Sequence, residues 1–326
     1  MKHLFILITI ASLLSSCGLL NPEEKSQLRI SANSVQFGEV VVGTSKDTSV
    51  TITNNSRSEF ELRRTRTITL WVSIAGDAYQ ILSDSLGAGE NSISLLPGQS
   101  VEVKIRCRPR TEGDATGELS ISHGADNLRT PVLIPLSASS NDLIPEITGL
   151  ISEGWTLFKE GRYTEGKTIF LTGDSLARIA SRYDSLRGEV LSGAGWTNLH
   201  LAEYNAARNS FERSLTQSDI SGETRANTRA GLAFAHYHAG AYYPAIYQLQ
   251  QLLEHRPDYE FRHESRVTAH RLQLLLAQSY YMAGLFEECA AHLKMLYPDE
   301  APFSADPETL LAILQEKLKG GFSKTV

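Results

Sequence analysis

Cysteine is scarce in this sequence, at 3 of 326 residues. Cys107 and Cys289 take inward positions in different halves of the chain, which argues against a disulfide and for two small core side chains. A basic surplus is also lacking, with 31 Lys and Arg against 37 Asp and Glu. That balance argues against a nucleic-acid-binding protein. The apolar content of 41% is ample for packed cores.

The chain starts with a short basic stretch and an apolar run at residues 4–14. The run is shorter than the about 20 residues that span a bilayer and is typical of a secretory signal. Leu14-Ser15-Ser16-Cys17 closely resembles the lipobox of bacterial lipoproteins. The resemblance implies cleavage before Cys17 and lipidation of its side chain. We therefore expect a signal peptide at 1–16, a lipidated tether at 17–27, and a location in the cell envelope, on the outer membrane and facing the periplasm or the surface.

Residues 28–139 predict a β-sandwich. Apolar and polar residues alternate in short runs rich in β-branched residues, separated by Gly, Pro, Asn and Asp. The runs lie at 49–53, 68–74, 101–107, 119–122 and 132–136.

This half also resembles the abnormal-spindle/hydin (ASH) type of immunoglobulin-like domain. The resemblance begins at Phe37-Gly38-Glu39 and Val50-Thr51-Ile52-Thr53-Asn54, and it continues through Leu96-Pro97-Gly98 to Ile134-Pro135-Leu136. It departs at 60–89, where the sequence is longer and rich in Arg. The resemblance implies a binding or spacer module without catalysis.

One strand of this half places a row of basic side chains on its outer face. If Val103 and Ile105 point inward, then Lys104, Arg106 and Arg108 point outward together. They form a candidate ridge for an acidic partner or lipid headgroups. The alternative is a solvated face that neighbours such as Glu102 and Glu118 neutralise.

The second half repeats one helical pattern four times. Each copy has a small residue at a turn, an aromatic two positions later, a small residue three further on and a large apolar residue four after that. The copies start at Gly161, Ala202, Gly240 and Gly284, so the spacings are 41, 38 and 44 residues. The pattern resembles the tetratricopeptide repeat, whose minimal period is about 34 residues. Gly154, Gly195, Ala233 and Ala277 supply the small positions of the first helices.

These patterns predict a multidomain chain, an all-β immunoglobulin-like sandwich followed by an all-α tetratricopeptide-like solenoid. We expect a linker at 140–146, four repeats at 147–303, and a capping helix and tail at 304–326.

The resemblance implies a concave groove lined by the first helices. The family's groove positions select, as partner-binding candidates, Trp155, Trp196, His200, Asn227, Tyr237, Arg271, Gln278 and Tyr281. Phe158 belongs to the same set of positions. Aromatic anchors beside Arg, Asn and Gln are typical of peptide-binding grooves. The alternative is that the two tryptophan rings pack between helices.

No catalytic or metal-binding pattern emerges, since His263-Glu264 lacks the second histidine of a zinc-protease helix. We expect a protein that is not an enzyme and has no cofactor and no metal. The leading hypothesis is a membrane-tethered scaffold that holds an envelope protein or peptide in its groove, attaches to the membrane by its lipid alone, and binds no nucleic acid. The alternatives are an assembly factor for an outer-membrane or secretion complex, and a cell-wall or glycan binder that uses Trp155 and Trp196.

Overall fold

The computed structural model describes residues 25–56, 66–82 and 92–318. Cys17, the signal peptide expected at 1–16 and most of the expected tether lie outside the described residues. The chain packs into two compact units. The first holds the described residues up to Gly38, Lys46–Cys107 and Ala115–Ala138, and the second holds Glu39–Ser45, Arg108–Asp114 and the chain from Ser139.

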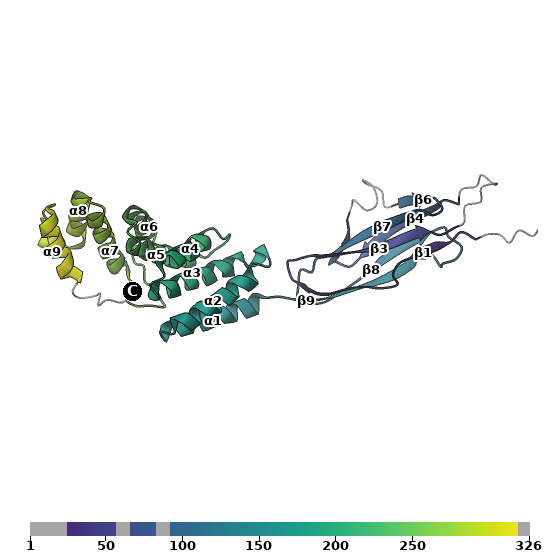
Figure 1. The fold of residues 1–326 in the computed structure, drawn as a ribbon, viewed down its shortest axis with the longest axis horizontal. Helices are drawn as coiled ribbons and strands as arrows, with labels where there is room; N and C mark the ends of the chain where they lie inside the picture. The colour runs from purple at the N-terminus through teal and green to yellow at the C-terminus, as the bar shows by residue number, and fades with distance from the viewer. Residues whose placement is uncertain (1–24, 57–65, 83–91, 319–326) are drawn as a thin grey trace, which may run out of the picture. The chain divides into compact units, whose positions relative to one another are not determined.

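Two β-sheets make up the first half of the chain, as predicted (Figure 1). One sheet has the order β1 (Leu28–Ile30), β3 (Lys46–Asn54), β7 (Ser100–Cys107) and β5 (Tyr79–Ile81). The other has the order β2 (Val35–Val41), β9 (Val132–Asn141), β8 (Gly113–His123), β4 (Ile68–Ala75) and β6 (Ser92–Leu95). The five expected runs correspond to β3, β4, β7, β8 and β9. The short strands β1, β5 and β6 have too few residues to show an alternation of their own.

The strand β7 shows how sequence alternation becomes packing. Val103, Ile105 and Cys107 are buried without exposed surface, because side chains alternate between the faces of a strand. Cys107 and Cys289 are both buried and neither is in a disulfide, as the sequence predicted.

A buried asparagine supports the end of β3. The Asn54 side chain donates hydrogen bonds to the carbonyl oxygens of Arg66 and Leu95, at 2.8 Å each. Leu95 lies on β6 of the other sheet, so one amide joins the two sheets where the backbone would otherwise bury unpaired carbonyl groups. This role gives a physical reason for an asparagine in the motif that ends β3.

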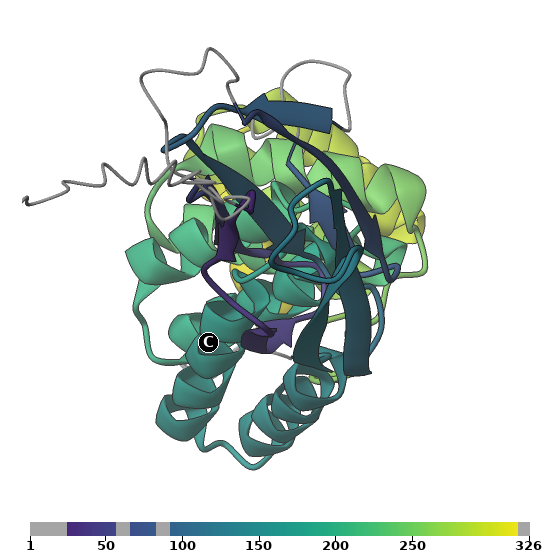
Figure 2. The ribbon, with the colours of Figure 1, turned by 90° about the vertical axis from the view of Figure 1, so that its right-hand side faces the viewer.

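Helices form the second half of the chain (Figure 1, with a view turned by 90° in Figure 2). The four predicted repeats are the pairs α1 (Ile144–Lys159) with α2 (Tyr163–Ala177), α3 (Asp184–His200) with α4 (Tyr204–Leu215), α5 (Gly222–His238) with α6 (Tyr242–His255), and α7 (Ala269–Met282) with α8 (Phe286–Leu296). Within the described part of the chain, no helix has both the length and the apolar character needed to cross a bilayer.

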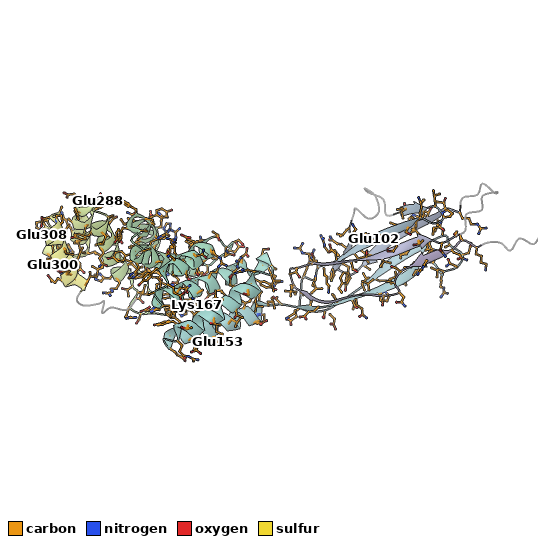
Figure 3. All side chains as sticks on the ribbon, in the orientation of Figure 1. Glu102, Glu153, Lys167, Glu288, Glu300 and Glu308 are labelled. Carbon is orange, nitrogen blue, oxygen red and sulfur yellow. The ribbon has the colours of Figure 1, made fainter. Side chains whose placement is uncertain are left out.

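The last helix, α9 (Pro307–Leu318), covers the end of the array. Asp306 accepts a hydrogen bond from the Thr309 backbone at 2.9 Å and so caps the helix start. Leu310 and Leu314 are buried against α7 and α8 residues. Glu300, labelled in Figure 3, accepts hydrogen bonds from Lys317 at 2.6 Å. The expected linker at 140–146 is shorter in the structure, because β9 continues to Asn141 and α1 begins at Ile144.

Glycines let the helices approach each other around two phenylalanines. A Cβ atom on Gly195 would lie 2.5 Å from the ring of Phe211, and one on Gly231 would lie 2.2 Å from it. Phe170 sits in the same way against Gly154 and Gly193, at 2.7 and 2.3 Å. Each phenylalanine of a second helix thus fills a slot between the first helices of two successive repeats. The sequence predicted one side of each slot, Gly154 and Gly195.

We expect Gly195→Ala to destabilise the helical unit and Gly149→Ala to stabilise it. Phe211 is fully buried and cannot turn away from a new methyl group, so overpacking should cost about 1–3 kcal/mol. Gly149, in α1, has open space where its Cβ would be, and alanine there should gain up to about 1 kcal/mol of helix propensity. Urea unfolding followed by circular dichroism at 222 nm measures both. Equal effects of the two substitutions would contradict the packing role of Gly195.

Candidate functional site

The segment between α6 and α7, residues 256–268, folds back on itself. We call it the α6–α7 loop. The Phe261 amide donates to the Val267 carbonyl at 2.9 Å, and the Ala269 amide donates to the Tyr259 carbonyl at 2.6 Å. Glu260 and Thr268 form an antiparallel bridge between the two arms. The loop is therefore a short hairpin, and it accounts for the longest repeat spacing in the sequence.

Aromatic side chains of this loop lie on the first helices α1, α3 and α5. The Phe261 ring stacks on Trp196 of α3 with centroids 4.3 Å apart, and the His263 ring stacks on Trp155 of α1 at 3.9 Å. The Tyr259 hydroxyl donates to the Asn227 side chain of α5 at 2.9 Å. The α6–α7 loop thus occupies the face that the sequence identified as the partner groove.

A hydrogen-bonded contact between a histidine and a carboxylate adds to the contact between loop and groove. The carboxylate of Glu264 lies 2.9 Å from His200 Nε2, and the two side chains are only 8% and 5% exposed. Burial works against ionisation of Glu264, but the hydrogen bond and charge of His200, together with Arg266, lower its pKa below the usual value. Tyr163 stacks on the His200 ring at 4.3 Å. His200 is thereby held in place to receive a carboxylate.

A small polar cavity of about 40 Å³ lies where the loop meets α3 and α5. Arg262 of the loop pairs there with Glu223 at 3.2 Å and with Glu189 at 3.5 Å. Burial raises the pKa of Glu189, while the charge of Arg262 lowers it in part. Burial and the charges of Arg262 and Lys159 lower the pKa of His263 to about 3. His263 therefore stacks on Trp155 as a neutral ring.

Neither tryptophan is exposed in the groove, so of the two alternatives the packed one holds. Trp155 is 5% exposed and Trp196 is fully buried. The Trp196 indole N–H donates to the Asn227 carbonyl at 3.1 Å, and Phe261 covers its face. Neither ring offers an open stacking platform for a sugar, as the glycan-binding alternative requires.

The other predicted groove residues fall into two sets. His200 and Asn227 contact the α6–α7 loop together with the two tryptophans, as described above. Tyr237, Arg271, Gln278 and Tyr281 are half-buried. Tyr237 packs edge-on against Tyr242, and Tyr281 packs edge-on against Phe286. The structure therefore brings four of the eight predicted residues together at the loop.

The basic ridge on β7 is partly neutralised. Arg106 makes two hydrogen bonds of 2.7 Å to Asp47, its cross-strand partner on β3. Lys104 shares the outer face and Arg108 follows the end of the strand. Glu118, expected as a neutralising neighbour, lies on β8 in the other sheet. The solvated-face interpretation holds for Arg106, with Asp47 as the neutralising group.

Sequence reasoning missed the loop residues Tyr259, Phe261, His263 and Glu264. Two signals were available for them: the 44-residue spacing, about ten residues above the minimal repeat, and the alternation Tyr259-x-Phe261-x-His263. Among the residues that the structure describes, no group of three or more His, Cys, Asp or Glu side chains is placed to hold a metal ion.

No protein-family model matches the sequence, and no curated protein matches it. Among solved structures, the chain is similar to the ASH/PapD-like domain 7 of human CEP192, with 12% identity over 43% of this chain and 99% of that one, at a TM-score of 0.28. It is similar to MamA of AMB-1, with 14% identity over 53% of this chain and 83% of that one, at a TM-score of 0.38. It is also similar to the VesB protease of Vibrio cholerae, with 11% identity over 35% of this chain and 32% of that one, at a TM-score of 0.26. At these identities the likeness concerns the fold alone.

Proposed function

We propose that this protein is a non-catalytic, protein-binding scaffold, tethered to a membrane of the bacterial cell envelope through Cys17. Its helical repeats bind a peptide segment of a partner protein on the face formed by α1, α3 and α5. One observation carries the proposal: this face already holds a peptide segment, the α6–α7 loop, by two ring stacks and two side-chain hydrogen bonds. Buried aromatic anchors are typical of the residues that carry most of the binding energy at protein interfaces.

Tyr237, Arg271, Gln278 and Tyr281 remain candidate partner contacts. They are half-buried and lie on α5 and α7, the first helices of the third and fourth repeats. A partner segment that extends along the first helices would meet these side chains. An assembly factor for an outer-membrane or secretion complex is a narrower form of the same function and stays a prediction.

Photocrosslinking in intact cells tests the proposal. A benzoylphenylalanine at position 278 or 281 should capture a protein partner. The same residue at positions 243 and 247, on the second helix α6, provides the control, since Tyr243 and Tyr247 are 63% and 56% exposed. Equal capture at all four positions, or none at 278 and 281, would contradict binding through the first helices.

We expect Cys17→Ala to release the protein from membranes. The lipid on this residue is the proposed anchor, and the described helices provide no membrane-spanning segment. Fractionation of cells followed by a high-salt wash measures the result. A mutant that stays in the washed membrane fraction would show that Cys17 is not the anchor or that a partner holds the protein there.

A further inference from the structure

The α6–α7 loop is attached to the groove by side chains alone. Its backbone hydrogen bonds lie within the loop or join it to the adjoining ends of α6 and α7. The Glu264 amide donates to the Phe261 carbonyl and the Val267 amide donates to the Glu264 carbonyl, both at 3.0 Å. Among the described residues, no backbone–backbone hydrogen bond joins the loop to α1, α3 or α5. The hairpin can therefore leave the groove without breaking a backbone hydrogen bond of α1, α3 or α5.

The loop side chains Tyr259 and Phe261 are buried in the helical core, but polar atoms at the same contact lack protein partners. Ser192 Oγ and His263 Nδ1 are buried there without a hydrogen-bond partner among the described protein atoms. Both residues line the cavity of about 40 Å³, which has room for water. A buried polar group without a protein partner lowers the net gain from docking. By contrast, the helices around Phe211 leave no space for even one methyl group.

The docked loop also indicates what the groove recognises. Trp196 stacks on the ring of Phe261. The Asn227 side chain accepts a hydrogen bond from the hydroxyl of Tyr259, two positions earlier in the loop. His200 contacts the carboxylate of Glu264. Trp155 receives a flat neutral ring next to that carboxylate. The recognised pattern is therefore two aromatic side chains two residues apart, followed three residues later by an acidic one.

We infer that the α6–α7 loop is an internal competitor that fills the groove until a partner segment of the same chemistry displaces it. The partner segment is a short peptide with two aromatic residues two positions apart and a carboxylate three residues after the second. This inference rests on the proposed function, because it assigns the chemistry and the control of the same groove. A partner then binds with an apparent affinity reduced by the fraction of molecules whose loop is docked.

Hydrogen exchange on the full-length lipidated chain in detergent tests the displacement. The probe is a synthetic peptide with the sequence of Pro257 to Thr268, labelled with heavy isotopes so that its fragments are distinguished from those of the protein. At saturating peptide, the amides of Phe261, Glu264 and Val267 should exchange faster, while the amides of α1 and α3 should not. A peptide with alanine at both aromatic positions should have no effect. Unchanged exchange of the loop at the highest peptide concentration would overturn the inference.

Variants of the loop test the competition. Glu264→Ala removes the hydrogen bond with His200, and Phe261→Ala removes the stack on Trp196. Each should lower the apparent Kd of the fluorescently labelled peptide by about tenfold or more, since a larger fraction of grooves is open. Ser265→Ala is the matched control, because Ser265 is exposed in the same hairpin. Circular dichroism shows whether the helices persist, and Glu264→Ala decides the matter if Phe261→Ala unfolds. A folded Glu264→Ala with the affinity of the wild type would overturn the inference.

Failure of the inference and failure of the proposed function give different results. If crosslinks form at positions 278 and 281 but the peptide does not displace the loop, the scaffold function stands and the assigned partner chemistry falls. If the peptide displaces the loop but no crosslinks form in cells, the competition stands and the scaffold function falls.

Discussion

Replacing Trp196 by alanine should lower the free energy of unfolding of the helical unit by about 3–5 kcal/mol, the usual cost of deleting a buried aromatic side chain. Trp196 has no exposed surface, and its ring meets Phe211, Phe234 and Phe261. Its indole N–H also donates to the Asn227 carbonyl, which would lose a partner inside the protein. The substitution therefore removes packing from α3, α4, α5 and the loop at once.

Thermal melting followed at 222 nm measures this effect. For a unit of this size, each kcal/mol shifts Tm by about 2–4 °C, so we expect a fall of about 6–20 °C. Tyr243→Ala is the matched control, because Tyr243 is an aromatic residue of the same unit that is 63% exposed; it should change Tm little. A Trp196→Ala protein that melts like the wild type would contradict the structural role and restore Trp196 as a surface anchor.

The helical half could be predicted because its rules are local and repeated. Small residues at Gly154, Gly195 and Ala207 recur at fixed distances from large apolar ones, and each repeat packs on the next by the same rule. The sequence contains four copies of this pattern of small and large residues. The second glycine at each phenylalanine, Gly193 at Phe170 and Gly231 at Phe211, was not predicted because it belongs to the next repeat.

The candidate site was predicted only in part. The repeat register correctly placed Trp155, Trp196, His200 and Asn227 on one surface, since first helices share a face. It could not show that this surface is occupied, because the occupant is a non-repeating segment. Docking of such a loop depends on single pairs such as Glu264 with His200, and those pairs leave no periodic signal in the sequence.

In the β half, the alternation of residues predicted which side chains are buried but not their neighbours across the sheet. Strand register decides that Arg106 faces Asp47, and register depends on which strands pair. That information is distributed over residues far apart in the chain. Glu118 looked like an equally good partner in the sequence and lies in the other sheet.

A buried carboxylate joins three helices of the first two repeats. Asp174 of α2 is 2% exposed and accepts hydrogen bonds from Arg178 of α2, Arg187 of α3 and Arg213 of α4. Burial works against its ionisation, but the three arginine hydrogen bonds outweigh burial and hold its pKa well below the usual value. Asp174 is therefore ionised in the folded protein across the physiological pH range.

We expect Asp174→Asn to destabilise the helical unit by about 2–3 kcal/mol at pH 7, less than the about 3–5 kcal/mol for breaking a fully buried pair. The reduction follows because Arg187, Arg213 and Arg178 are 20%, 35% and 56% exposed and can be hydrated when the carboxylate is lost.

A carboxylate whose folded pKa lies below its ordinary value of 3.8 stabilises the fold above about pH 4 and loses that effect as the pH falls further. The difference in unfolding free energy between the variant and the wild type should therefore become smaller below pH 4. Urea unfolding at pH 7, 5 and 3 measures this difference. Glu165→Gln, which breaks an exposed pair with Arg162, is the control and should change the free energy of unfolding little at every pH. If the loss of unfolding free energy in Asp174→Asn stays constant from pH 7 to pH 3, the stabilisation by the three arginines does not depend on the charge of Asp174.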